Sequence, residues 1–252
     1  MRGHPGARLT LRRGDLGIRH HLRDLAAHVS APLRRGILYR SDHLGGLDAE
    51  DAQAIQALGV KRVLDFRGVH ERTSAACRLP GVQVHSLAIE PTIVQVLSDL
   101  LASGHALTEA DVVSHMQDTY RGFVRTSTHR FAEFFAHLLE SNEPTVFHCT
   151  AGKDRTGFAA VLVLRALGAR DDEVMRDYLL TNELLQPARI RGDWALPEHA
   201  AKVLYGVQPE FLDAALREID VNWGGMENYL HTGLGLAQSE RQRLRDLYLA
   251  QS

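Results

Sequence analysis

The stretch "TVFHCTAGKDRTGFAAVLVLRALG", residues 145–168, constrains the fold more than any other part of the chain. Its first residues are a short apolar run that predicts a buried strand ending at Cys149. Its last fourteen residues are a long apolar run that predicts a helix closed by Gly168. Only five small or polar residues separate Cys149 from Arg155, so the strand must turn sharply into the helix.

The rest of the chain alternates strand and helix patterns in its first half and is mostly helical afterwards. The predicted strands lie within 36–48, 61–68, 82–89 and 145–149. The predicted helices are 48–59, 92–125 with a break near 102–105, 129–140, 155–168, 171–186, 194–205, 209–220, 225–231 and 238–250. This order predicts an α/β fold with a central parallel-rich sheet flanked by helices and a helical C-terminal half. We interpret residues 1–252 as a single domain.

Composition narrows the range of partners and compartments. The net charge of -2 gives no overall field that would recruit nucleic acid or an anionic membrane, so attraction for an anion must be local. We find no apolar run long enough to span a membrane and no apolar segment typical of a signal peptide near the N-terminus. A cytoplasmic location is the default expectation, and secretion without a cleaved signal stays open. Two cysteines in 252 residues fit a reducing compartment or reactive chemistry.

The loop from Cys149 to Arg155 has the composition of an anion site. The backbone N–H groups of Thr150, Ala151 and Gly152 can point inward and form a nest, and the helix that follows adds the positive end of its dipole. The guanidinium of Arg155 matches two oxygens of a phosphate. These groups all favour the thiolate of Cys149, which predicts a nucleophile aimed at phosphorus.

Two neighbours of the loop have predicted supporting roles. Thr156 could donate its hydroxyl to the sulfur, and His148 is placed to fix the loop backbone through a ring nitrogen. A nucleotide-binding P-loop is excluded, because that motif needs a glycine where Phe147 stands and a hydroxyl where Asp154 stands. A sulfurtransferase loop would not need Arg155. No cluster of Cys and His at metal-ligand spacing is found, so we expect no metal and no cofactor.

The string "HCTAGKDRTG" resembles the active-site loop of bacterial tyrosine and lipid phosphatases of the atypical dual-specificity type. Further stretches that look like landmarks of that family occur in the same order: "LRDLA" (22–26), "LYRSDHL" (38–44), "VLDFRG" (63–68), "DYLLTN" (177–182) and "LGL" with a closing helix (234–250). The resemblance implies a phosphatase that acts through a phosphocysteine, most of all on protein phosphotyrosine. Phosphoserine, phosphothreonine or phosphoinositide substrates are further expectations.

The general acid has two candidates. Asp154 lies inside the loop, as in the resembled family, whereas Asp65 ends a predicted strand and could project over the same pocket. Asp65 could instead pair with Arg67 or Arg155 and hold a guanidinium in place. We favour Asp154 and keep Asp65 as the alternative.

Several further interpretations stay open. Lys153 either adds attraction for a second phosphate or is a solvated side chain, and Arg67 is a second candidate for phosphate contact. Segment 92–125 is either a helical lid over the pocket or ordinary core. Cys77 is either inert or a resolving thiol. The alternative to an enzyme is a phosphate-binding pseudophosphatase that recognises phosphorylated partners without turnover.

Overall fold

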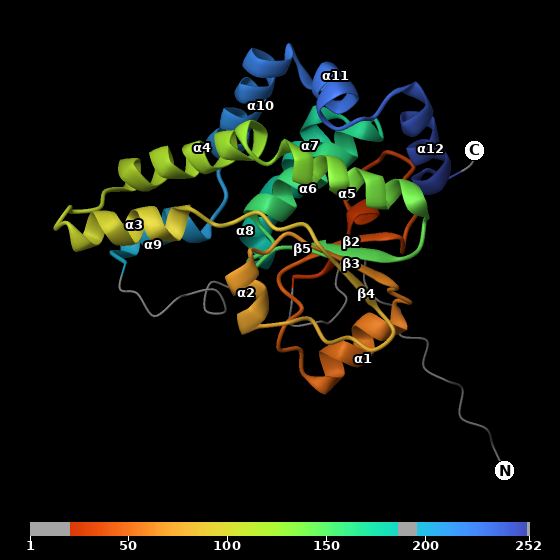
Figure 1. Ribbon diagram of the computed structural model, residues 1–252, viewed down its shortest axis with the longest axis horizontal. Coiled ribbons are helices and arrows are strands. Elements are labelled where there is room, and N and C mark those ends of the chain that lie inside the picture. The colour runs from red at the N-terminus through yellow and green to blue at the C-terminus, as the bar shows by residue number, and fades with distance from the viewer. Residues whose placement is uncertain (1–20, 186–195, 251–252) are drawn as a thin grey trace.

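The computed structural model describes residues 21–185 and 196–250 (Figure 1). Within these residues, five strands form one sheet in the order β1-β2-β5-β3-β4. The edge strand β1 runs antiparallel to β2, and the other three pairings are parallel. The bounds are β1 Arg23–Asp24, β2 Leu38–Ser41, β3 Arg62–Asp65, β4 Gln83–Ser86 and β5 Thr145–His148.

Alternation along the strands divides the apolar core between the two faces of the sheet. In β5, Phe147 belongs to the larger core cluster and Val146 to the smaller one, and both are fully buried. In β3, Leu64 and Val63 divide in the same way. This period of two is what a strand buried on both faces requires.

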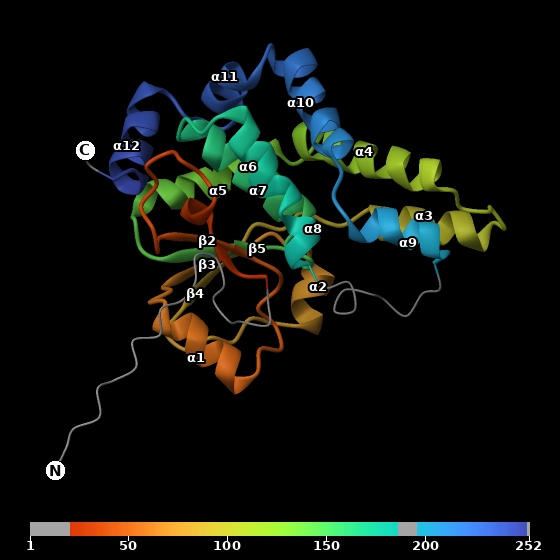
Figure 2. The ribbon, with the colours of Figure 1, turned by 180° about the vertical axis from the view of Figure 1, so that it is seen from behind.

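Helices cover both faces. The larger cluster includes residues of α4, α5, α6, α7, α9, α10 and α12, whereas the smaller cluster includes Ile55 of α1 (Figures 1 and 2). Helix α6 follows β5 directly and is buried along most of its length. The bounds are α1 Ala49–Ala57, α2 Val69–Ser74, α5 Thr128–Glu140, α6 Asp154–Ala166, α7 Asp171–Leu179, α8 Thr181–Leu184, α10 Pro209–Trp223, α11 Met226–Asn228 and α12 Gln238–Tyr248.

Three helices extend beyond the sheet as an arm: α3 (Ile93–Ala102), the first half of α4 (Glu109–Arg125) and α9 (Glu198–Tyr205) (Figures 1 and 2). The side chain of Thr108 caps α4 by accepting from the N–H of Asp111. A ring nitrogen of His199 in α9 bonds the carbonyl of Leu107 at 2.9 Å, which joins α9 to the α3–α4 turn. The hypothesis that 92–125 acts as a lid stays a prediction.

The predicted fold class is confirmed: a mostly parallel sheet lies between helices, and the C-terminal half is helical. Helix α1 begins at the predicted cap, Asp48, and ends before Gly59, whose φ is +74°. The sequence did not predict β1 or α2, and the predicted helix 171–186 is divided into α7 and α8. Residue 186, residues 194–195 and the N-terminal segment examined for a signal lie outside the described residues. Among the described residues, no helix is long and apolar enough to cross a membrane.

Candidate active site

The loop that joins β5 to α6 surrounds Cys149. Strand β5 ends at His148 and α6 begins at Asp154, and Cys149 is only 2% exposed. Gly152 has a φ of +65°, and a Cβ built on it would lie 2.3 Å from the carbonyl oxygen of Ser41. Only glycine therefore fits this close turn of the loop against β2.

The loop leaves a row of donors unused. Within residues 21–185 and 196–250, no acceptor is found for the backbone N–H groups of Thr150, Ala151, Gly152 and Lys153. The first N–H groups of α6 also lack partners inside the helix, as at any helix N-terminus. The carbonyl side of the loop is anchored instead, because the N–H of His43 donates to the Thr150 carbonyl at 3.1 Å. This arrangement can hold an anion above Cys149.

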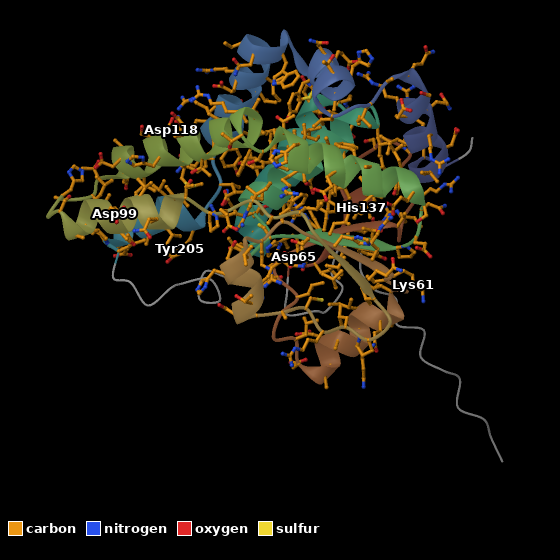
Figure 3. The ribbon with its side chains drawn as sticks, viewed as in Figure 1. Lys61, Asp65, Asp99, Asp118, His137 and Tyr205 are labelled. Carbon is orange, nitrogen blue, oxygen red and sulfur yellow. The ribbon has the colours of Figure 1, made fainter. Side chains whose placement is uncertain are left out.

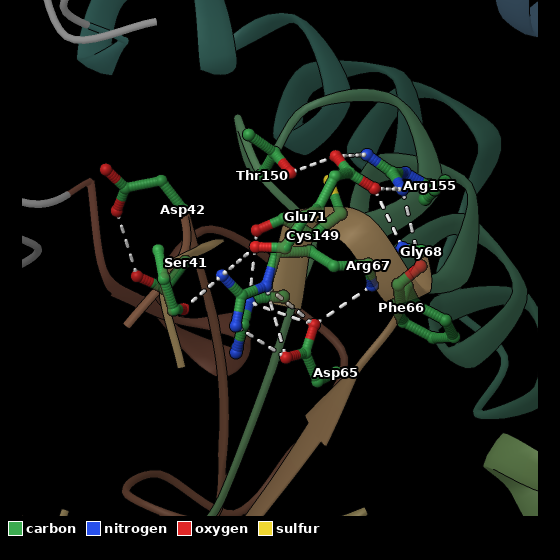
Figure 4. A network of polar contacts seen from close by, with 12 residues as sticks. Ser41, Asp42, Asp65, Phe66, Arg67, Gly68, Glu71, Cys149, Thr150 and Arg155 are labelled. Carbon is green, nitrogen blue, oxygen red and sulfur yellow. Dashed lines mark hydrogen bonds and ion pairs between the residues drawn. The ribbon is translucent and has the colours of Figure 1, made fainter. Parts of the chain in front are cut away.

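Arg155 is held by a carboxylate from α2. Its Nη1 and Nη2 donate to Oε2 and Oε1 of Glu71 at 2.7 and 2.9 Å, and Nη1 also donates to the Ile89 carbonyl at 2.8 Å (Figure 4). Glu71 additionally accepts from the hydroxyl of Thr150 and from the N–H of Gly68. Burial works to lower the pKa of Arg155, but Glu71 and Cys149 outweigh it and raise that pKa. The guanidinium is therefore a fixed, permanent cation beside Cys149.

Asp65 is paired with Arg67 at the end of β3. Arg67 Nη2 donates to Oδ2 at 2.7 Å, its Nε contacts both carboxylate oxygens, and its backbone N–H donates to Oδ1 at 2.9 Å (Figure 4). Both side chains are buried, and Figure 3 shows where Asp65 lies in the molecule. Burial would raise the pKa of Asp65, but His148 and Arg67 outweigh it and lower that pKa. Arg67 also donates to the Ala75 carbonyl at 2.7 Å, so its guanidinium holds two elements together.

His148 and Thr156 lie on either side of the loop and are fully buried. Nδ1 of His148 lies 3.0 Å from the carbonyl oxygen of Cys149, and because a carbonyl only accepts, Nδ1 must carry the proton. Burial lowers the pKa of His148 despite the nearby Asp65, so the ring is neutral at pH 7. The hydroxyl of Thr156 has no hydrogen-bond partner among the described residues.

Asp154 is the first residue of α6 and remains partly exposed. Its Oδ1 accepts from the hydroxyl of Tyr120 at 3.0 Å and from Nζ of Lys153 at 2.9 Å. Lys153 is 4% exposed and also donates to the carbonyl of Gly206 at 3.0 Å, so it is not a solvated side chain. The structure therefore brings Asp154 and Lys153 to the same end of the loop as Arg155.

Buried charges support the loop from below. Arg40 of β2 donates to the carbonyl of Gly152 at 3.1 Å and to Asp177 of α7 at 2.6 Å. Arg23 of β1 donates to the same carboxylate at 3.1 Å. Burial and the neighbouring Arg40 lower the pKa of Arg23 to about 10, so it is still a cation at pH 7. A ring nitrogen of His21 bonds the carbonyl of Ala151 at 2.6 Å.

The sequence analysis missed several of these residues. Glu71 lies on a six-residue helix without periodicity, and the sequence carries no local signal for its pairing with Arg155. Arg40 and Asp177 stand within the quoted landmarks "LYRSDHL" and "DYLLTN", which was the available signal. Tyr120 lies in segment 92–125, where the sequence predicts helices and carries no signal that singles out this residue. Among the described residues, no group of three or more His, Cys, Asp or Glu is placed to hold a metal ion.

Comparisons of the sequence with known proteins show the family to which the chain belongs. A sequence model of the tyrosine phosphatase family matches residues 19–250. The chain is 34% identical to a Cupriavidus necator protein that is named a tyrosine-protein phosphatase, over 90% of this chain and 83% of that protein. It is 29% identical to the triple specificity protein phosphatase PtpB of Mycobacterium tuberculosis, over 91% of this chain and 96% of that one.

The chain belongs to the tyrosine phosphatase family. The family and the enzyme class predicted from the sequence are thereby confirmed. Among solved structures, the chain is similar to P. aeruginosa TpbA with a TM-score of 0.32 and 19% identity, over 75% of this chain and 91% of that one. The family assignment does not depend on that likeness.

Proposed function

We propose that the protein hydrolyses phosphomonoesters, most of all protein phosphotyrosine, through a phosphocysteine intermediate. The observation that carries the proposal is the position of Cys149, beside Arg155, at the base of a loop whose four N–H groups find no acceptor in the described part of the chain. The thiolate attacks phosphorus, an S–P bond forms, and the P–O bond to the leaving group breaks. The loop N–H groups and Arg155 stabilise the charge on the three equatorial oxygens.

Asp154 is the general acid of this proposal. It protonates the leaving oxygen, and its carboxylate then takes a proton from the water that attacks phosphorus and releases Cys149. Its partial exposure and its place at the start of α6 support this role. Asp65 is the weaker candidate, because both of its oxygens are engaged by Arg67 and its pKa is lowered, which disfavours the protonated form.

The remaining predicted residues receive supporting roles. Thr150, Ala151, Gly152 and Lys153 supply backbone N–H groups to the phosphate. His148 fixes the loop through the Cys149 carbonyl. The hydroxyl of Thr156, which has no partner among residues 21–185 and 196–250, can donate to the sulfur anion when the thiolate leaves. Arg67 acts through Asp65 and Ala75 and is not a phosphate contact in this proposal.

The substrate range rests on the relatives' names. One relative is named a tyrosine-protein phosphatase and another a triple specificity protein phosphatase, which supports phosphotyrosine first and other phosphate esters second. Phosphoinositides stay in the proposal through the charge of Lys153 beside the loop. Comparing kcat/KM on a phosphotyrosine peptide and on a phosphoinositide ranks the two classes.

Three variants test the mechanism with 4-nitrophenyl phosphate and vanadate. Cys149→Ser is expected to abolish turnover while vanadate still binds, and measurable turnover by this variant would refute the nucleophile. Asp154→Asn is expected to lower kcat/KM by about 10²–10³ and Asp65→Asn to change it less. A larger loss of kcat/KM for Asp65→Asn than for Asp154→Asn would make Asp65 the general acid. A wild-type protein that binds vanadate and hydrolyses no phosphate ester would instead be a pseudophosphatase.

A further inference from the structure

The two carboxylate oxygens of Asp154 have different surroundings. Oδ1 accepts from the hydroxyl of Tyr120 at 3.0 Å and from Nζ of Lys153 at 2.9 Å. In the part of the chain that the structure describes, no donor reaches Oδ2. Because Oδ1 already accepts two hydrogen bonds, a proton on this carboxyl group belongs on Oδ2.

Tyr120 is itself held by a second tyrosine. The hydroxyl of Tyr178 in α7 lies 2.8 Å from the hydroxyl of Tyr120 in α4, and the two rings meet edge to face with centroids 6.3 Å apart. Both side chains are fully buried. Since Tyr120 must donate to the carboxylate of Asp154, it must accept from Tyr178, which fixes the direction of the whole chain of hydrogen bonds.

We propose that Tyr120, oriented by Tyr178, is a positioning residue that holds Oδ1 of Asp154 and so presents Oδ2, with its proton, to the leaving oxygen. This inference rests on the proposed function, because it requires Asp154 to be the general acid. It adds to the site two residues, from α4 and α7, to which the sequence analysis gave no role.

The tyrosines orient the acid and do not supply its proton. The direction of the hydrogen bonds is the same whether Asp154 is ionised or protonated on Oδ2, because Oδ1 accepts in both states. Burial, with help from the negative charge of Asp154, raises the pKa of Tyr120 well above its ordinary value, so its hydroxyl keeps its proton through the cycle. A proton transferred to the leaving group therefore comes from Oδ2.

Tyr120→Phe is the direct test, because it removes one hydroxyl and keeps the ring that packs against Phe123 and Phe211. Tyr178 retains an alternative acceptor in the carbonyl of Gln208 at 3.4 Å, so its hydroxyl is not left without a partner. The matched control is Tyr229→Phe, which removes a buried hydroxyl bonded to Thr128 at 3.1 Å.

The readout is kcat/KM on two aryl phosphates that differ in their need for an acid. Phenyl phosphate has a poor leaving group and needs protonation, whereas 2,4-dinitrophenyl phosphate has a good one and does not. For Tyr120→Phe we expect kcat/KM to fall by about tenfold on phenyl phosphate and by less than about twofold on the dinitrophenyl ester. The tenfold loss is part of what a general acid contributes. Vanadate inhibition and the thermal midpoint of Tyr229→Phe and Tyr120→Phe are compared in parallel.

A double-mutant cycle shows whether Tyr120 acts through Asp154. In the Asp154→Asn background, Tyr120→Phe is expected to cause no further loss on phenyl phosphate. The inference would be overturned if Tyr120→Phe lowered kcat/KM as much in the Asp154→Asn background as in the wild type. It would also be overturned if Tyr120→Phe lowered kcat/KM equally on both esters, or if it behaved as Tyr229→Phe does. If Tyr120→Phe does not fold, Tyr178→Phe carries the same test, with an expected loss of about threefold confined to phenyl phosphate.

The design separates this inference from the function on which it rests. If Asp154→Asn itself shows no dependence on the leaving group, the acid assignment fails and the inference fails with it. If Asp154→Asn shows that dependence and both tyrosine variants behave as the control does, only the positioning role of Tyr120 is wrong.

Discussion

Replacing Glu71 by Gln removes the negative charge that faces Arg155 and keeps the shape of the side chain. Burial works to raise the pKa of Glu71, but hydrogen bonds and charge from Arg155, with help from Thr150 and Gly68, lower it from 4.5 to about 2. At about 1.36 kcal/mol per pKa unit, this corresponds to roughly 3 kcal/mol of stability at pH 7. The side chain is 19% exposed, so solvent screening is modest.

An independent argument gives a similar magnitude. Arg155 is buried, and breaking a buried ion pair by removing one partner typically costs about 3–5 kcal/mol, because the other charge is left uncompensated. We therefore expect Glu71→Gln to lower the free energy of unfolding at pH 7 by about 3 kcal/mol. Glu109→Gln, at an exposed position in the first turn of α4, is the control and should stay within about 0.5 kcal/mol of wild type.

The pH dependence gives the refuting measurement. The pKa of Glu71 is lower in the folded than in the unfolded protein, so its contribution is complete well above pH 4.5 and is lost as the pH falls toward 2. Urea unfolding at pH 7 and pH 3 should show the gap between wild type and Glu71→Gln shrinking at the lower pH. A gap below about 1 kcal/mol at pH 7, or one that does not change with pH, would refute this reasoning.

The same substitution tests how Glu71 affects activity. Gln keeps one acceptor oxygen, so Arg155 loses one of the two hydrogen bonds that together fix the plane of its guanidinium. Under the proposed mechanism we expect kcat/KM on 4-nitrophenyl phosphate to fall by about 10²–10³, the loss typical of one misplaced donor. Vanadate affinity should fall with it, and an unchanged affinity would show that Arg155 stays in place without Glu71.

Two further predictions concern the support of the loop. Gly152→Ala places a Cβ against the carbonyl of Ser41 at a φ of +65°, so it should lower both the thermal midpoint and kcat/KM. The control is Gly59→Ala, at a φ of +74° with open space around it. It should lower the thermal midpoint by less and leave kcat/KM unchanged. Burial lowers the pKa of His21 to about 4, although Asp42 and the Ala151 carbonyl act to raise it. The imidazole of His21 therefore destabilises the folded state as the pH falls from 6.5 toward 4. In His21→Gln, the free energy of unfolding measured with urea should change less with pH between 6.5 and 4 than in the wild type.

Apart from Asp65 and Arg67, the site residues that the sequence predicted are contiguous in the chain. Cys149 and Arg155 are separated by one tight loop, and a strand before it and a helix after it leave few arrangements of the backbone between them. His148 bonds the carbonyl of the next residue, which is a local contact that needs no knowledge of the rest of the fold. The strand before the loop and the helix after it could also be predicted, because buried elements produce apolar runs in the sequence, as a strand covered on both faces does.

The partners of these residues come from distant elements and could not be predicted. Glu71 lies 84 positions before Arg155, on a helix too short to show a period. For Asp65 the sequence left two interpretations, a general acid over the pocket or a carboxylate paired with Arg67 or Arg155. Only the observed geometry shows that the two are paired and buried. Tyr120 meets Asp154, and Tyr178 meets Tyr120, because α4 and α7 pack around α6, which no local pattern encodes.

The pairing of charges around the loop also bears on how the site would hold a dianion. Arg155 faces Glu71 and Arg67 faces Asp65, whereas Arg40 and Arg23 share the single carboxylate of Asp177. Three carboxylates therefore offset most of the charge of these four cations. Under the proposed mechanism, the attraction for phosphate therefore comes mainly from the N–H groups of residues 150–153 and the start of α6. Backbone dipoles in a fixed loop bind the equatorial oxygens by geometry, which favours the transition state over any other anion of equal charge. A chain with a net charge of -2 can thus hold a phosphate dianion although the cations around its loop exceed their carboxylate partners by only one.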